Sequence, residues 1–301
     1  MRIFITGGTG FIGRTLCKAL LEAGHQLTIL SRTPRSAASK YGEGVAIVDS
    51  LDSWTSNSRY DAVINLAGEP IADRRWTHRR KRVLWDSRIT LTGQLLEAIA
   101  RAEAKPAVLI SGSAIGVYGD RGDSPLDEDS TCLGGGFGQT LCARWEAEAA
   151  KAESLGVRVC ILRTGLVIGQ DGGFLQKMLP LFKLGLGGRL GDGKQWMSWV
   201  HIDDHVAMTR FLLNSPRLSG IFNATAPNPV TNADFTRRLA KLLRRPAILP
   251  VPAWLTRLGA GEMAELLLGS QRVLPKRMLA EDFGFTHETL ESALSDILKI
   301  G

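Results

Sequence analysis

Residues 3–13 read Ile3-Phe4-Ile5-Thr6-Gly7-Gly8-Thr9-Gly10-Phe11-Ile12-Gly13, an apolar run followed by a glycine-rich turn. A continuous apolar run of this kind is typical of a strand buried in a parallel sheet. Apolar residues then recur at helical spacing from Arg14 to Ala23, which predicts a helix directly after the turn. The chain therefore opens with a strand, a glycine turn and a helix.

The glycines of this turn fit G-x-G-x-x-G when counted from Gly8 and G-x-x-G-x-x-G when counted from Gly7. Such a turn needs a positive φ, lets the backbone approach a pyrophosphate and allows the helix to pack closely on the strand. The N-terminus of the helix adds free N–H groups and a partial positive charge. An ordinary glycine-rich turn is the alternative, but the flanking strand and helix favour dinucleotide binding. The predicted cofactor-binding residues of the turn are Gly7, Thr9, Gly10, Phe11, Ile12 and Gly13.

The composition is that of a folded α/β protein. With 301 residues, of which 44% are hydrophobic and 22% charged, the chain can bury a full core as one large domain or as a domain with a cap. No apolar run of 18 residues occurs, and the first strand leaves no room for a signal peptide before it. We therefore expect a cytoplasmic protein without a membrane partner.

Neither the four cysteines nor the net charge of +7 predicts a specific ligand. The cysteines lack the spacing of metal ligands, so we expect packing residues or free thiols and no metal. The positive charge is spread along the chain except in residues 74–82. On a helix these cations cover several faces, which indicates a solvated helix; a phosphate-facing role for one or two of them is the alternative. We expect no nucleic-acid partner.

The end of the second predicted strand, residues 26–30, selects the dinucleotide. An acidic residue there would hydrogen-bond the adenosine ribose hydroxyls of NAD, whereas a cation accommodates the extra phosphate of NADP. Ser31 and Arg32 follow this strand, and no acidic residue occurs between Glu22 and Glu43. A hydroxyl and a guanidinium suit a 2′-phosphate, so the sequence predicts NADP(H) as the cofactor. A solvated Arg32 in a loop is the alternative.

Three more short apolar runs predict strands over residues 45–48, 61–66 and 106–110. The second of these runs ends in small residues, which let a cofactor lie across the carboxyl end of a strand. A helix is predicted before the third strand, through residues 89–100. The small residues at the end of the strand 61–66 extend the predicted cofactor site by Leu66, Ala67 and Gly68.

Five segments match motifs of one superfamily. They are residues 6–13 (T-G-G-x-G-x-x-G), 65–68 (N-A-A-G), 113–119 (S-S-x-x-V-Y-G with one extra residue), 162–169 (a sixth strand and the loop that meets the nicotinamide) and 191–204 (G-D-G through I-H-V-D-D). On these motifs the chain resembles an extended short-chain dehydrogenase/reductase, the superfamily of the nucleotide-sugar epimerases and dehydratases. Beyond residue 225, the segments 225–229 and 270–275 resemble an atypical epimerase-like branch with its own C-terminal module.

The resemblance implies a Tyr-x-x-x-Lys pair, in which the lysine lowers the tyrosine pKa and the phenol exchanges a proton with the substrate. This chain contains no such pair. If Glu146 is aligned with the acid that follows the family lysine, Gly138 takes the tyrosine position and Cys142 the lysine position. Arg88 aligns with an asparagine that lines the site. An arginine there would bind a cofactor phosphate or an acidic substrate, or else form a structural ion pair.

Ser113 and Tyr118 are the predicted catalytic residues. The Ser113 hydroxyl would polarise a carbonyl, or would instead satisfy a backbone group at the strand end. Tyr118 is a replacement acid, although the tyrosine of the resembling segment usually packs beside the cofactor. Without a lysine nearby, its pKa is expected near ~10. The resemblance also implies that the backbone of Leu166 contacts the nicotinamide amide.

The second half of the chain is predicted to form a cap. Residues 185–191 have the glycine density of a flexible lid, and the helix that follows Asp203 and Asp204 is expected to be capped by one of these two residues. The segment 231–243 predicts a further helix, and the chain ends in a helical tail.

The predicted fold is therefore a doubly wound, Rossmann-like parallel α/β sheet with a small, mainly helical C-terminal substrate or cap region. The expected division is an NADP-binding domain over residues 1–165 and a discontinuous cap over 166–301, with 201–225 returning to the sheet. The predicted function is an NADP(H)-binding oxidoreductase or epimerase-like enzyme that acts on a small polar substrate. The missing Tyr-Lys pair favours the alternative, a catalytically silent NADP(H)-binding sensor. The sequence selects no particular substrate or oligomeric state.

Overall fold

The computed structural model describes residues 1–41, 44–132 and 134–299 and contains a seven-stranded sheet in which every neighbouring pair is parallel. The strands lie in the order β11-β7-β5-β4-β1-β2-β3, so the winding reverses between β1 and β4. In open α/β sheets, ligands bind outside the carboxyl ends of the strands at this reversal. The strands are β1 Arg2–Thr6, β2 Gln26–Leu30, β3 Val45–Val48, β4 Ala62–Asn65, β5 Val108–Ala114, β7 Arg158–Thr164 and β11 Gly220–Ala224.

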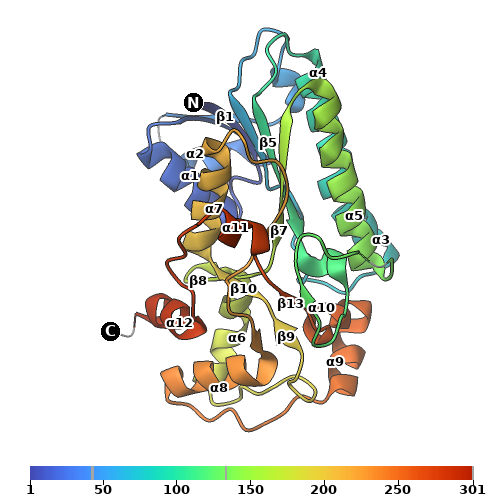
Figure 1. The fold of residues 1–301 in the computed structure, drawn as a ribbon, viewed down its shortest axis with the longest axis vertical. Helices are drawn as coiled ribbons and strands as arrows, with labels where there is room; N and C mark the ends of the chain where they lie inside the picture. Colours follow the sequence, from blue (N-terminus) through green and yellow to red (C-terminus); the bar gives the residue numbers. More distant parts are fainter. Residues whose placement is uncertain (42–43, 133, 300–301) are drawn as a thin grey trace.

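Helices cover both faces of the sheet (Figure 1). Successive side chains of a strand point to opposite faces, and the three central residues of β1 are apolar. Ile3 and Ile5 belong to the core on one face and Phe4 to the core on the other. The predicted doubly wound fold is confirmed. The first face carries α1 Phe11–Glu22, α2 Pro34–Tyr41, α7 Ile202–Asn214 and α11 Lys276–Ala280, and the second α3 His78–Trp85, α4 Leu91–Arg101 and α5 Phe137–Ala150.

The remaining elements form a cap at the carboxyl end of the sheet, which is the lower end in Figure 1. The cap has its own apolar core, in which Trp199 and Phe235 are fully buried. Its helices are α6 Gly173–Lys183, α8 Asn232–Leu243, α9 Ala253–Ala260, α10 Glu265–Leu268 and α12 Leu290–Leu298. Outside the main sheet, the described residues form three short strand pairs: β6 Pro125–Leu126 with β13 Arg272–Val273, β8 Leu166–Gly169 with β10 Trp199–His201, and β9 Trp196–Met197 with β12 Val230–Thr231.

Short helical turns of other types complete the described chain. A five-residue π-helix over Asp86–Thr90 joins α3 to α4. The 3₁₀ helices are Leu51–Ser53, Ile115–Tyr118, Lys151–Leu155 and Gly261–Ala264. β11, within residues 201–225, lies at the edge of the main sheet beside β7. The division of the chain at residue 165 remains a prediction.

The structure corrects two local expectations, the end of strand β5 and the residue that caps helix α7. The strand of the apolar run 106–110 was expected to end in Ser111-Gly112-Ser113, and the pairing of β5 with β7 continues to Ala114 opposite Thr164, so Ser113 lies inside the strand. The expectation that Asp203 or Asp204 caps α7 is wrong, because the His201 imidazole accepts the hydrogen bond from the Asp203 amide (3.2 Å). Asp204 is fully buried and instead accepts hydrogen bonds from the amides of residues 286 and 287 (2.8 and 3.0 Å), which fastens the C-terminal segment to α7.

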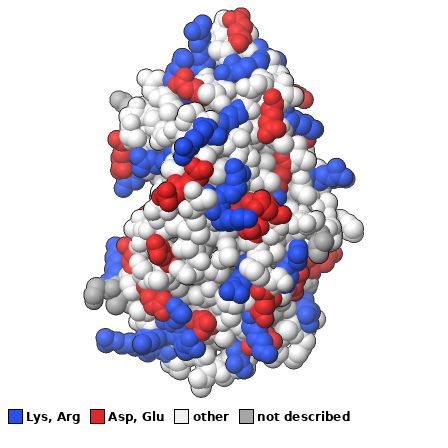
Figure 2. Space-filling view, in the orientation of Figure 1, with Lys and Arg blue, Asp and Glu red and all other residues white. Residues whose placement is uncertain are grey.

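No helix within the described ranges is long and apolar enough to cross a membrane. Lysine, arginine and acidic side chains are interspersed over the face that Figure 2 shows, in keeping with the spread of charge along the sequence. The surface of this face therefore carries no single-sign field over its whole extent.

Candidate functional site

The glycine turn between β1 and α1 is closed so tightly that only glycine fits at two of its positions. Gly7 has a φ of +72°, and a Cβ atom there would lie 2.4 Å from the carbonyl oxygen of Leu66. A Cβ atom at Gly13 would lie 2.2 Å from the carbonyl oxygen of Gly7. The turn therefore packs directly against the loop that follows β4, and α1 packs directly against the turn.

The first turn of α1 offers backbone N–H groups at the carboxyl edge of the sheet. The helix begins at Phe11 after Gly10, which has no side chain to cap it. The first N–H groups of a helix have no partner within the helix, and together with the helix dipole they favour an anion. This backbone fits the pyrophosphate of a dinucleotide, as predicted for Gly10, Phe11 and Ile12.

Tyr41 supports the turn from the end of α2, a role that the sequence did not reveal. Its hydroxyl donates a hydrogen bond to the carbonyl oxygen of Gly8 (2.5 Å). Burial raises the pKa of Tyr41 above its usual range, and the neighbouring Cys17 raises it further. The phenol therefore stays protonated and remains a donor. Nothing in the local sequence around Tyr41 indicates this contact, because it spans 33 residues.

Polar side chains hold the loop after β4 beside the glycine turn. The Thr6 hydroxyl donates to Asn65 Oδ1 (2.6 Å) and accepts from the amide of Ala67 (3.2 Å). The Asn65 amide in turn donates to the hydroxyl of Thr92 on α4 (2.8 Å). Leu66, Ala67 and Gly68 are thereby fixed at the carboxyl end of β4, next to the predicted pyrophosphate site.

Arg32 lies at the end of β2, as predicted, but it is not a free cation. Its Nη1 atom is 2.7 Å from Oε1 of Glu69, and Arg80 binds the other oxygen of the same carboxylate at 3.2 Å. These hydrogen bonds, first of all that from Arg32, hold the pKa of Glu69 below its usual range. The Ser31 hydroxyl is buried and accepts from the Thr33 amide (3.2 Å). A phosphate at this position would compete with Glu69 for Arg32.

Arg88 lies below the same loop, on the π-helix between α3 and α4. Its guanidinium donates to the carbonyl oxygens of Glu69 (3.0 Å) and Leu84 (3.3 Å) and lies 5.4 Å from the Trp145 ring centroid. Burial lowers its pKa from the ordinary value. No ion pair of Arg88 with a carboxylate occurs among the described residues. The predicted structural ion pair is therefore not formed, and the charge of Arg88 is not neutralised by a carboxylate, as the predicted anion binding would require.

The positions expected for the proton-transfer pair hold no such chemistry. Cys142 is buried, and desolvation raises the pKa of its thiol to about 12. At Gly138, a Cβ atom would lie 3.0 Å from Oε1 of Glu265 and 3.4 Å from Trp76. The Glu265 carboxylate accepts a hydrogen bond from the Gly138 amide (3.3 Å) at the start of α5. The space for a larger side chain at Gly138 is thus taken by a residue from the C-terminal part of the chain, which sequence reasoning missed.

Ser113 and Tyr118 are joined in one buried polar network. The Ser113 hydroxyl donates to Oε1 of Glu146 (2.6 Å), and the Arg163 guanidinium binds both oxygens of that carboxylate (2.9 and 2.8 Å). A third nitrogen of Arg163 donates to the Tyr118 hydroxyl (2.9 Å), which donates to Asn223 Oδ1 (2.8 Å). The network links β5, α5, β7 and β11 behind the carboxyl edge.

The network sets the protonation of its members. Burial raises the pKa of Tyr118 to about 12, and the hydrogen bond and positive charge of Arg163 offset this rise only in part. The expectation of an unchanged tyrosine pKa is therefore wrong, since burial was not visible in the sequence. Burial alone would lower the pKa of Arg163, but its bonds to Glu146 and Tyr118 raise it. Tyr118 stays protonated and Arg163 stays charged at neutral pH.

Leu166 and Phe11 lie on the cap side of the edge. The Leu166 amide donates to the carbonyl oxygen of Ser198 (2.8 Å), so a contact of Leu166 with a nicotinamide would use its carbonyl or side chain. The Phe11 ring packs against the loop between β8 and α6, where a Cβ atom at Gly172 would lie 2.4 Å from the ring. Both predicted residues therefore face the boundary between sheet and cap.

The basic stretch 74–82 is only in part the solvated helix that was expected: Arg74, Arg79 and Arg82 are exposed, whereas other cations of the stretch bind distant segments. Arg75 donates to the carbonyl oxygens of Leu258 and Gly259 (2.7 and 2.6 Å). Lys81 pairs with Glu262 at 2.5 Å. These cations hold the C-terminal part of the chain against α3, a pairing over about 180 residues that no local pattern could indicate.

A parallel sheet in this order, with a glycine turn and an uncapped helix start after β1, beside the reversal of the winding, defines a dinucleotide-binding protein of the Rossmann class. Residues 3–224 match the NAD dependent epimerase/dehydratase family, and the chain belongs to that family. Residues 251–297 match a domain of unknown function, DUF1731. The resemblance predicted from the motifs, with its separate C-terminal module, is confirmed.

Relatives of similar length share this architecture. Epimerase family protein MT2273 of Mycobacterium tuberculosis is 40% identical over 97% of this chain and 96% of its own length. The chloroplastic SDR39U1 homologue of Arabidopsis thaliana is 37% identical over 99% of this chain and 87% of its own. The crystal structure of human epimerase family protein SDR39U1 (isoform 2) with NADPH has a TM-score of 0.91 and 32% identity, and each chain is covered completely.

The buried Glu146–Arg163 pair generates a stability prediction. Replacing Glu146 by alanine leaves the Arg163 charge buried without its carboxylate, and breaking such a pair costs about 3–5 kcal/mol. Urea unfolding measures this loss. The double variant Glu146→Leu/Arg163→Met removes both charges and should recover most of it. A loss below about 1 kcal/mol for Glu146→Ala would show that the network does not support the fold.

Proposed function

We propose that this chain binds NADP(H) across the carboxyl edge of the sheet, with the pyrophosphate at the start of α1. The observation that carries the proposal is the turn from Gly7 to Gly13, where backbone contacts exclude side chains and the helix begins on an uncapped glycine. The NADPH of the human relative's structure supports the choice of cofactor. In this proposal Ser31 and Arg32 bind the 2′-phosphate. The other cofactor contacts are Leu66, Ala67, Gly68, Arg88 and Leu166.

The proposed activity is that of a reductase or epimerase-like enzyme on a small polar substrate between the sheet edge and the cap. The bound cofactor would supply or accept hydride at its nicotinamide ring. The chain itself would orient that ring and offer the Ser113 hydroxyl to a substrate oxygen. Tyr118 is the second candidate group, because it shares a network with Ser113 and stays protonated.

A second candidate function is a catalytically silent NADP(H)-binding sensor. The observation that favours it is the closure of the network: the Ser113 and Tyr118 hydroxyls both bind protein partners, and the two side chains are 4% and 0% exposed. Neither Gly138 nor Cys142 replaces them as a proton carrier. In this alternative, bound NADPH persists and changes the affinity for a partner.

Cofactor selectivity tests the proposal. NADPH should bind at least tenfold more tightly than NADH, because a guanidinium–phosphate pair contributes upwards of ~1.4 kcal/mol. Arg32→Ala should remove most of that difference and leave NADH binding unchanged. Titration calorimetry of both cofactors with both proteins gives the four affinities.

Arg35→Ala is the matched control, because Arg35 is also exposed and lies three residues further along. It should keep the preference for NADPH if the effect comes from a specific contact rather than from net charge. Equal affinities of the wild type for both cofactors, or an Arg32→Ala variant with unchanged affinity for NADPH, would contradict the assignment of Arg32 to the 2′-phosphate.

Turnover separates the two candidate functions. Positioned acid–base catalysis contributes ~10²–10⁴-fold, so reduction of ordinary carbonyl and sugar-nucleotide substrates should be slow here. Ser113→Ala should lower any turnover that occurs by about tenfold or more, and Tyr118→Phe by less, as followed by NADPH absorbance. Rapid turnover that survives both substitutions would show that the catalytic centre lies elsewhere. A complete lack of turnover, together with partner binding that depends on NADPH, would favour the sensor.

A further inference from the structure

Most of the exposed large apolar side chains gather on one part of the cap. Eleven such side chains occur among the described residues, and eight of them lie in three short segments. Ile248 is 80% exposed and Leu184 72%. Clusters of this kind on a soluble protein mark interaction surfaces, whereas isolated apolar residues do not. We call the following set the apolar patch: Leu181, Leu184, Leu186, Ile248, Leu249, Trp254, Leu255 and Leu258.

The three segments of the apolar patch lie side by side. The Val251 amide donates to the carbonyl oxygen of Arg189, and the Gly191 amide donates to that of Val251 (both 2.8 Å). A Cβ atom at Gly185 would lie 3.4 Å from Pro246. The end of α6, the linker after α8 and the start of α9 therefore form one continuous surface.

Helix α9 has its apolar face turned outward. It buries Thr256 and Ala260, while Trp254, Leu255 and Leu258 are 65%, 45% and 67% exposed. An amphipathic helix in a water-soluble cap normally buries its apolar face. Arg75 fixes this unusual orientation by donating to the carbonyl oxygens of Leu258 and Gly259. The exposure is thus held by the fold.

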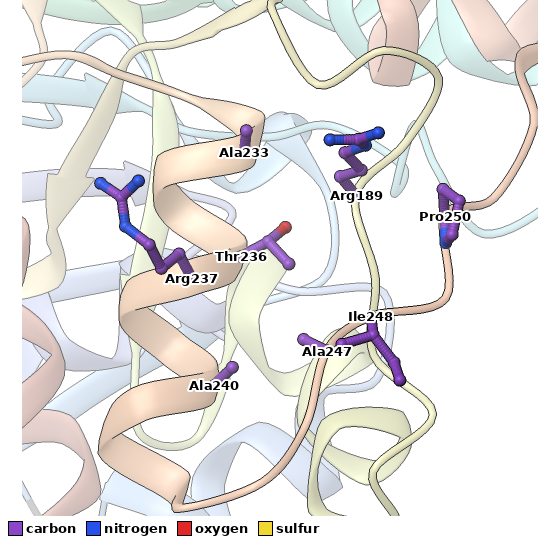
Figure 3. Close-up of a pocket in the computed structure, with 8 residues that line it drawn as sticks. All are labelled: Arg189, Ala233, Thr236, Arg237, Ala240, Ala247, Ile248 and Pro250. Atoms are coloured by element: carbon purple, nitrogen blue, oxygen red, sulfur yellow. The ribbon is translucent and has the colours of Figure 1, made fainter.

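The linker also stands away from α8. A cavity of about 510 Å³ lies between them, with Ala233 and Thr236 of α8 on one side and Arg189 and Ile248 on the other. Figure 3 shows Ala247 directed toward α8 and Ile248 directed away from it. The Ile248 side chain is therefore available to a partner rather than to the cap.

Cations surround the apolar patch. The 27 residues from Phe235 to Gly261 contain six lysines and arginines and no acidic residue. Arg244, Arg245 and Arg257 are exposed within this stretch, and Lys183 and Arg189 are exposed beside it. Lysine and arginine side chains are visible along the lower margin of the molecule in Figure 2, together with acidic ones, where α8 lies in Figure 1. The patch is apolar at its centre, and at its edge the cations outnumber the exposed acidic residues Asp192 and Glu262.

We propose that this face of the cap docks on an anionic phospholipid membrane surface. Exposed leucine and tryptophan side chains would enter the boundary between headgroups and acyl chains, and the surrounding cations would bind lipid phosphates. A second copy fits less well, because a symmetric interface would place the same cations opposite one another. The expectation of no membrane partner rested on the lack of a spanning segment, and surface docking needs none.

Vesicle sedimentation tests this proposal with the full chain. The wild type should pellet with phosphatidylcholine vesicles that contain about one-third phosphatidylglycerol and remain in solution with pure phosphatidylcholine. Arg244→Glu/Arg245→Glu and Trp254→Ser/Leu258→Ser should each lower binding by about tenfold or more. All four side chains are exposed, so thermal melting should show that both variants stay folded.

Two matched controls make the result specific. Arg59→Glu/Arg101→Glu causes the same change in net charge at exposed positions that precede β4 and β5, at the amino edge of the sheet. Leu279→Ser removes an exposed leucine from α11. Both controls should bind within about twofold of the wild type. Binding that the controls lower equally, equal binding to both vesicle types, or no binding to either would overturn the proposal. A dimer that Trp254→Ser/Leu258→Ser dissociates would assign the face to a second copy instead.

Discussion

The close approach of Gly7 to the carbonyl oxygen of Leu66 is the constraint on which the structure depends. It brings the turn after β1 against the loop after β4, at the point where the winding of the sheet reverses. Any side chain at Gly7 would separate the two segments, and one at Gly13 would lift α1 from the turn. The same contact therefore fixes the fold and places the N-terminus of α1 at the carboxyl edge, where an anion can bind.

Behind this edge, a buried ion pair supports the sheet layer. The Glu146–Arg163 pair binds Ser113 and Tyr118 and joins four elements of the sheet layer. The C-terminal part of the chain is fastened to α3 and α5 by Lys81, Arg75 and Glu265. Glu265 also fills the space beside Gly138. At the positions expected for the Tyr-x-x-x-Lys pair, the chain thus has a glycine beside Glu265 and a buried cysteine.

Local patterns predicted the parts of this molecule that local physics determines. The apolar run at residues 3–5 and the glycines after it gave β1, the turn and α1, and the residues after β2 indicated the cofactor. The sequence did not indicate contacts between distant segments. These are the hydrogen bond from Tyr41 to the carbonyl oxygen of Gly8, the ion pair of Arg32 with Glu69, and the hydrogen bond from Arg75 to the backbone of α9. The lack of a Tyr-x-x-x-Lys pair was visible in the sequence, whereas the residue that fills its space was not. Burial, which raises the pKa of Tyr118, also depends on the assembled fold.

The most direct measurement is a crystal structure of this chain with NADPH. The account predicts the pyrophosphate within hydrogen-bond distance of the backbone amides at the start of α1. It also predicts the 2′-phosphate in contact with Ser31 and with Arg32, which must then share or leave Glu69. A 2′-phosphate directed into solvent, or NADPH bound away from the glycine turn, would contradict the account.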